Sequence, residues 1–167
     1  MITIGLDPGY ERLGVAVIET SGGKKDELLY STCLTTLRTL SFPERLKQLA
    51  DNIEKVLIKY RPNILAVEEL FFSGNQKTAM KVSEVRGMII YLAVRAGVTI
   101  INLTPLQVKM SLTGYGRASK SQVSTMIGKL VCLPTGPRHD DESDAIAIAL
   151  AGAAQARQTL IHTRARQ

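Results

Sequence analysis

Four carboxylates in this chain stand where apolar runs end or where a helix begins. Asp7 and Glu68 each follow a short apolar run, and Asp141 and Asp144 open an alanine- and isoleucine-rich segment. A carboxylate at the end of a buried strand is costly to desolvate unless something pairs with it. Mg²⁺ prefers hard oxygen ligands, and a pair of such ions can activate water and stabilise a leaving oxygen. Convergence of the four acids would therefore predict a divalent-cation site.

Each part of this acidic set also has a plainer explanation. Asp141 and Asp144 are three residues apart and share a helix face, yet N-capping and the helix dipole also favour acids in a first turn. Acids at strand ends beside turns are common as well. Asp140 adjoins Asp141 and is an alternative ligand, but the three-residue spacing to Asp144 favours Asp141.

The net charge of +6 is unevenly distributed along the chain. No acidic residue occurs between Glu84 and Asp140, and the chain ends in a basic segment. Such basic surfaces attract polyanions through counterion release, although they are also compatible with an ordinary solvated face. Acids surrounded by basic residues suggest a metal-dependent enzyme that acts on nucleic acid. The basic residues of the acid-free stretch are Arg86, Arg95, Lys109, Arg117, Lys120, Lys129 and Arg138.

Several other side chains are candidates for contact with a nucleic acid. Phe71 and Phe72 either fill the core or provide one exposed ring that stacks on an unpaired base. Lys109 and Lys120 are either ordinary surface lysines or groups that stabilise charge at a scissile phosphate. His139 is compatible with proton transfer or metal ligation, but a lone histidine beside acids is more often incidental.

Composition narrows the class of protein. The 167 residues fit one domain, and a hydrophobic content of 45% is enough to bury a core. No apolar stretch approaches the ~20 residues that span a bilayer, and the first residues lack the charged segment of a signal peptide. We therefore expect a cytoplasmic protein. The two cysteines, Cys33 and Cys132, lack metal-ligand spacing and are interpreted as small core residues.

Periodicity and turn signals predict ten elements, which we expect to form an α/β fold. Three antiparallel strands come first, followed by helices that alternate with two more strands, so the sheet is mixed, has five strands and carries helices on both faces. Strands ending in Asp7 and Glu68 can run parallel and share one edge. The predicted strands cover 2–7, 13–19, 27–37, 64–68 and 98–101, and the predicted helices cover 43–61, 76–96, 105–111, 119–131 and the segment from 141 onward.

An ordered set of motifs resembles the RuvC family of bacterial Holliday-junction resolvases, which belongs to the RNase H-like superfamily. The resemblance extends from residue 2 to about residue 154. It rests on Gly5-Leu6-Asp7-Pro8-Gly9, Ala66-Val67-Glu68-Glu69-Leu70-Phe71, the segment from Asn75 to Gly87, Pro105-Leu106-Gln107-Val108-Lys109, the segment from Gly114 to Gln122, and Asp141-Glu142-Ser143-Asp144-Ala145-Ile146-Ala147.

The resemblance implies an RNase H-like nuclease domain over residues 1–155, followed by a basic tail over 156–167 that we expect to be disordered. It implies a homodimeric endonuclease that resolves four-way junctions in DNA recombination and repair, uses two Mg²⁺ ions (with Mn²⁺ as a possible substitute) and partners the RuvA–RuvB branch-migration complex. The expected catalytic and metal-binding residues are Asp7, Glu68, Asp141 and Asp144, and the expected DNA-binding residues are Phe71, Arg86, Lys109 and Lys120.

One stretch departs from the family pattern and leaves alternatives open. RuvC proteins commonly carry a Thr-Gly-Tyr-Gly-like stretch where this chain has Leu13-Gly14-Val15-Ala16, which resembles the YqgF-type RNA-processing nucleases. A junction-binding module without catalysis is a second alternative. For the dimer, we expect the helix over 76–96 to present Ala79, Val82, Ile89 and Leu92 to a second copy.

Overall fold

The computed structural model describes residues 1–21, 25–70, 76–133, 136 and 138–164. Its element order confirms the predicted succession of strands and helices, with one short strand added. Among the described helices, none has the length and apolar character needed to cross a membrane. The strands are β1 (Ile2–Asp7), β2 (Arg12–Glu19), β3 (Asp26–Thr35), β4 (Ile64–Glu68), β5 (Thr99–Leu103) and β6 (Val131–Cys132). The helices are α1 (Phe42–Tyr60), α2 (Gln76–Arg95), α3 (Pro105–Thr113), α4 (Lys120–Leu130) and α5 (Asp140–Arg164).

The six strands form one mixed sheet in the order β5-β4-β1-β2-β3-β6. Strands β1, β2 and β3 make the expected antiparallel meander, while β4 lies parallel to β1 and β5 lies parallel to β4. The five-strand prediction omitted β6, because Val131 was assigned to the end of a helix. That helix ends at Leu130, and Val131–Cys132 pairs in parallel with Asp26–Glu27 at the edge of the sheet.

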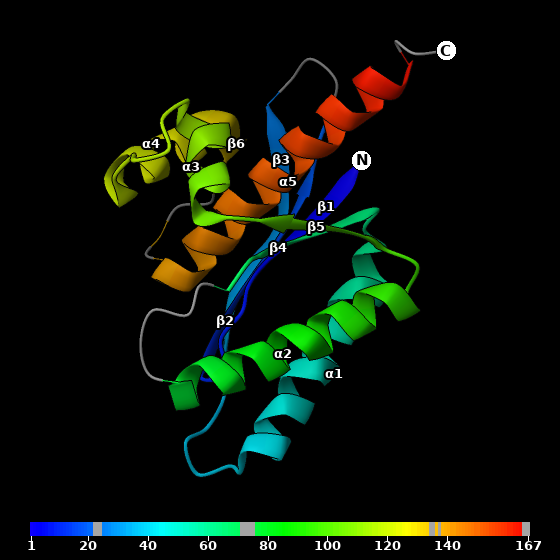
Figure 1. Cartoon of the computed structure of the whole chain (residues 1–167), viewed down its shortest axis with the longest axis vertical. Coiled ribbons are helices and arrows are strands. Elements are labelled where there is room, and N and C mark those ends of the chain that lie inside the picture. The colour runs from blue at the N-terminus through cyan, green and yellow to red at the C-terminus, as the bar shows by residue number, and fades with distance from the viewer. Residues whose placement is uncertain (22–24, 71–75, 134–135, 137, 165–167) are drawn as a thin grey trace.

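The strands alternate between two core faces, as period-two side-chain alternation requires. Large side chains such as Ile4, Leu6 and Val15 pack against α1 and α2. The opposite face carries small residues, including Ala16 and Ala66, and packs against the alanine-rich α5 together with α3 and α4. Figure 1 shows the sheet between these two helical layers, which confirms the predicted helices on both faces.

Glycines let α5 lie directly on the sheet. A Cβ atom added to Gly5 would overlap backbone atoms of Ala145 and Ala149, and one added to Gly14 would overlap the carbonyl oxygen of Asp141. Backbone therefore contacts backbone here without an intervening side chain. Because Gly14 lies opposite Asp7 in the β1–β2 pairing, the first turn of α5 is held beside the end of β1.

The structure corrects the expected dimer face of α2. Ile89 and Leu92 are buried in the core against the sheet and are not available to a second copy. Two of the four residues predicted from apolar spacing thus belong to the domain's own core, whereas Ala79 and Val82 are partly buried. The large exposed apolar side chains of α2 are Met80, Tyr91 and Val94.

Helix α5 continues without a break across the predicted domain boundary at residue 155 and ends at Arg164. The part of the expected tail from 156 to 164 is therefore helical. Arg157 donates two hydrogen bonds of 2.8 Å to the carboxylate of Asp26 at the start of β3, which ties this part of the helix to the sheet. The division of the chain into a domain and a tail stays a prediction.

Candidate active site

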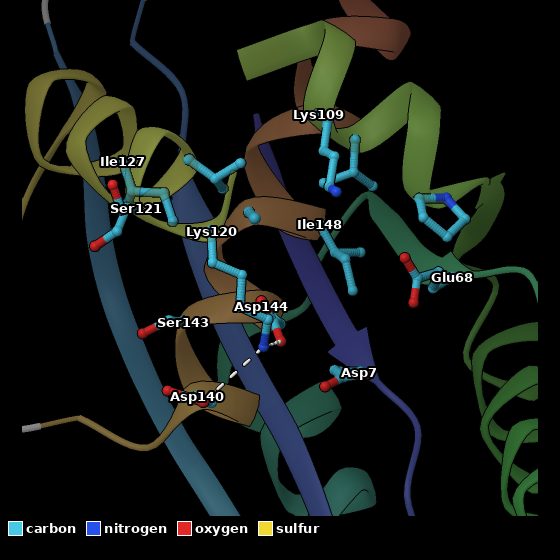
Figure 2. Close-up of a pocket in the computed structure, with 15 residues that line it drawn as sticks. Asp7, Glu68, Lys109, Lys120, Ser121, Ile127, Asp140, Ser143, Asp144 and Ile148 are labelled. Atoms are coloured by element: carbon cyan, nitrogen blue, oxygen red, sulfur yellow. Dashed lines mark hydrogen bonds and ion pairs between the residues drawn. The ribbon is translucent and has the colours of Figure 1, made fainter. Parts of the chain in front are cut away.

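Asp7 and Glu68 end neighbouring parallel strands, as the sequence predicted. The register pairs Leu6 with Val67, so the two acids are the next residues along β1 and β4. Alternation along the strands places both on the face that packs against α5. In Figure 2 the two side chains lie at the ends of their strands and face one cleft of about 480 Å³.

The first turns of α5 bring Asp144 and Asp140 to the same cleft. The carboxylate of Asp144 lies 3.4 Å from Nζ of Lys120, and the carboxylate of Asp140 lies 3.9 Å from the same nitrogen. Asp140 is 89% exposed, whereas Asp144 is half-buried beside the strand ends. The structure thus brings together three of the four predicted acids and adds Asp140 at the rim.

Asp141 lies at the predicted place on α5, but its carboxylate does not line the cleft. Its Oδ2 atom lies 3.2 Å from Nε of Arg12 and 3.9 Å from Sγ of Cys33. The sequence connected neither partner with the acids: Cys33 was expected to be a small core residue, and it is only partly buried. Arg12 comes just before the strand pattern of β2 and reads as an ordinary surface residue, so no sequence signal connected it with an acid that follows much later in the chain.

Two capping boxes place the lysines on the other side of the cleft. Thr104 caps α3 through the backbone N–H of Gln107, and Ser119 caps α4 through the backbone N–H of Gln122. The helices begin at fixed points for that reason. Lys120 therefore stands at the first position of α4, and Lys109 projects from α3 toward Glu68 (Figure 2).

Arg86 lies close to the site but engages protein groups. Its Nε donates to the backbone oxygen of Glu68 at 3.2 Å, and its terminal nitrogen donates to the side chain of Asn102 at 2.6 Å. The guanidinium thus fixes the end of β4, which carries Glu68. Its predicted contact with DNA stays a prediction.

Crowded acids raise one another's pKa. Burial, followed by repulsion from Asp144 and then from Glu68 and Asp141, raises the pKa of Asp7 from 3.8 to about 7. Burial and repulsion from Asp144 also raise the pKa of Glu68, against the opposing effect of Lys109. The neighbouring Asp144 raises the pKa of Lys120. The cleft therefore holds more negative charge than its two lysines neutralise.

The donors fit a divalent cation, although they are not arranged as a finished metal site. Within the described ranges, no group of three His, Cys, Asp or Glu side chains is placed to hold a metal ion. The partly buried carboxylates of Asp7 and Glu68 line the cleft together with Asp144, and burial, followed by repulsion from Asp144, raises the pKa of both. Hard oxygen donors that repel one another are what Mg²⁺ binds. The fourth acid, Asp141, is turned toward Arg12.

The remaining candidates from the sequence are Phe71, Phe72 and His139. Phe71 and Phe72 lie outside the described residues, so the expected stacking ring stays a prediction. His139 does not line the cleft, and its backbone oxygen accepts the N–H of Ser143 at 3.1 Å in the first turn of α5.

The mixed sheet carries acids at its strand ends, α5 adds further acids, and lysines lie opposite them. This fold and this site are those of a nuclease of the RNase H-like class. A family model described as crossover junction endodeoxyribonuclease RuvC matches residues 3–152, and the chain belongs to this family. The resemblance predicted from the motifs is thereby confirmed.

Individual relatives agree over nearly the whole chain. The crossover junction endodeoxyribonuclease RuvC of Ruminiclostridium cellulolyticum is 42% identical over 150 residues, which is 90% of this chain and 90% of the relative. The structure of T. thermophilus RuvC in complex with a Holliday junction substrate aligns with a TM-score of 0.90 and 35% identity, over 95% of this chain and 96% of that one. The yeast mitochondrial Holliday junction resolvase Ydc2 is only 14% identical and shares the fold, with a TM-score of 0.69 over 93% of this chain and 79% of the other.

Proposed function

We propose that this protein is a Holliday-junction resolvase, an endodeoxyribonuclease that hydrolyses phosphodiester bonds of a four-way DNA junction during recombination and repair in the cytoplasm. The observation that carries the proposal is the cleft in which Asp7, Glu68 and Asp144 face Lys109 and Lys120. Membership of the RuvC family supports it, as does the alignment with a relative solved together with a Holliday junction.

The acids would hold Mg²⁺, with two ions per site and Mn²⁺ as a possible substitute. Asp7 and Glu68 are the primary ligands because their positions at the ends of two paired strands are fixed by the sheet. Asp144 would join them from α5, and Asp141 would complete the set once its carboxylate leaves Arg12. Such ions, when bound, supply a nucleophilic water at neutral pH and stabilise the leaving oxygen.

The lysines would act on the scissile phosphate. Lys120 now pairs with Asp144 and Asp140, and Lys109 faces Glu68. When cations take over the carboxylates, both ammonium groups become available to the phosphate oxygens. There they would stabilise the negative charge that develops during hydrolysis.

Symmetric cutting of a junction requires two active sites, so we propose that the protein works as a homodimer. The exposed face of α2 with Met80, Tyr91 and Val94 would supply part of the contact. Phe71 follows Glu68 by three residues and would stack on bases at the crossover. The family resemblance further supports a partnership with the RuvA–RuvB complex.

The test is cleavage of three labelled substrates: a synthetic four-way junction, a matched duplex and a structured RNA, each with and without Mg²⁺. We expect Mg²⁺-dependent, paired nicks in the junction alone. The Asp7→Asn variant should bind the junction without cutting it. Cleavage of the RNA without a preference for junctions would instead indicate an RNA-processing nuclease, and binding without turnover would indicate a non-catalytic junction-binding module.

A further inference from the structure

Asp141 lies over the middle of three neighbouring strands at the start of α5. Its backbone lies directly over Gly14 in β2. Gly14 pairs with Asp7 of β1 on one side and with Cys33 of β3 on the other. The backbone of Asp141 therefore lies over β2, between the strand that ends in Asp7 and the strand that carries Cys33, and its charge is close enough to raise the pKa of Asp7.

In this structure the carboxylate of Asp141 points away from the cleft. Its Oδ2 atom is 3.9 Å from Sγ of Cys33 and 3.2 Å from Nε of Arg12. Arg12 precedes Gly14 by two residues and so projects from the same face of β2. This ion pair explains why Asp141 does not line the cleft that Asp7 and Asp144 line.

We infer that Arg12 is a positioning residue, which holds the Asp141 carboxylate away from the metal site and releases it when a DNA phosphate takes the guanidinium. The inference rests on the proposed metal-dependent function. Its consequence is that the set of four acidic ligands is completed only on DNA.

Exposure and charge make this exchange feasible. The Arg12 side chain is 61% exposed, whereas that of Asp141 is 22% exposed, so the guanidinium can be approached from solvent while the carboxylate stays near the cleft. Exposed ion pairs are weak, and a guanidinium binds phosphate through paired hydrogen bonds. By linkage, bound DNA tightens metal binding by the same factor by which bound metal tightens DNA binding.

A double-mutant cycle tests the inference through metal affinity, without any measurement of cleavage. Mn²⁺ binding is followed by electron paramagnetic resonance in the absence of DNA, and melting curves check that each variant is folded. We expect Arg12→Gln to bind Mn²⁺ roughly two- to fivefold more tightly than the unaltered protein, because the weak ion pair no longer competes. Arg12→Lys keeps the charge and should restore the original affinity.

The second half of the cycle separates the ion pair from a general effect of charge. In an Asp141→Asn background, Arg12→Gln should leave Mn²⁺ affinity unchanged, because no carboxylate remains to be released. Arg38→Gln is the matched control, because Arg38 is 86% exposed, pairs with Glu11 and carries the same charge. The inference would be overturned if Arg12→Gln tightened Mn²⁺ binding equally with and without Asp141, or if it did not tighten Mn²⁺ binding in the otherwise unaltered protein.

A DNA arm completes the test with a junction made non-hydrolysable by phosphonate linkages at the crossover. We expect this junction to tighten Mn²⁺ binding less in Arg12→Gln than in the unaltered protein. The difference should equal the factor by which Arg12→Gln tightens Mn²⁺ binding in the absence of DNA. An equal effect of DNA on both proteins would contradict release by phosphate. If Arg12→Gln tightens Mn²⁺ binding only when Asp141 is present but the protein cuts no junction, the resolvase proposal alone is refuted. If the protein cuts junctions but Arg12→Gln leaves Mn²⁺ affinity unchanged, the inference alone is refuted.

Discussion

Replacing Asp7 by Asn should stabilise the metal-free protein at neutral pH. The pKa of Asp7 rises from 3.8 to about 7 because the carboxyl group is buried among other acids. Each pKa unit corresponds to about 1.4 kcal/mol, so the ionised carboxylate costs the folded state roughly 4 kcal/mol. Asn has a similar shape and no charge, and it removes this cost.

The pH dependence gives the sign of the effect. Well below pH 4 the carboxyl group is protonated in the folded and unfolded states alike, and this group then makes no difference to the relative stability of the two proteins. Between pH 4 and pH 7 only the unfolded state ionises, so the unaltered protein loses about 1.4 kcal/mol per pH unit through this group. The advantage of Asp7→Asn should therefore grow as pH rises and level off above pH 7.

Urea unfolding in EDTA, repeated from pH 4 to pH 8, measures this difference. Adding Mg²⁺ should stabilise the unaltered protein more than the variant and shrink the gap, because the ligand binds only the folded state. Asp51→Asn serves as the control, since Asp51 is a half-exposed carboxylate on α1 that pairs with Lys47. A difference that stays flat with pH, or a less stable Asp7→Asn protein, would refute the reasoning.

Three further changes test other parts of the structure. Gly14→Ala should cost about 1–3 kcal/mol in urea unfolding because its Cβ would meet the backbone of α5, whereas Gly128→Ala on α4 meets nothing and should not destabilise. Tyr91→Asp on the exposed face of α2 should convert a dimer to a monomer in sedimentation without lowering the melting temperature, and an unchanged mass would remove α2 from the interface. Phe71→Ala should slow single-turnover junction cleavage more than it weakens binding, by up to the ~1–3 kcal/mol of one stacked base; a collapsed melting curve would show instead that the ring belongs to the core.

The sequence was sufficient to predict the strands that end in Asp7 and Glu68, because runs of apolar residues bounded by turns report local structure directly. It also predicted the helix that carries Asp144. The orientation of Asp141 could not be predicted, since it depends on Arg12 and Cys33, which only the folded sheet brings near α5. Likewise, apolar spacing on α2 did not reveal that Ile89 faces the domain's own core.

The glycine contacts under α5 also fix the helix against sliding and rotation. Gly5 meets Ala145 and Ala149, and Gly152 would overlap the side chain of Ala66 if it carried a Cβ, so contacts at successive turns define one axial position. A shift by one residue would turn the helix by about 100° and carry Asp144 off the cleft. Because the helix sets its own position, the connection before Asp140 does not have to do so. A chain with residues inserted into that connection should therefore keep Asp144 aligned with the ends of β1 and β4.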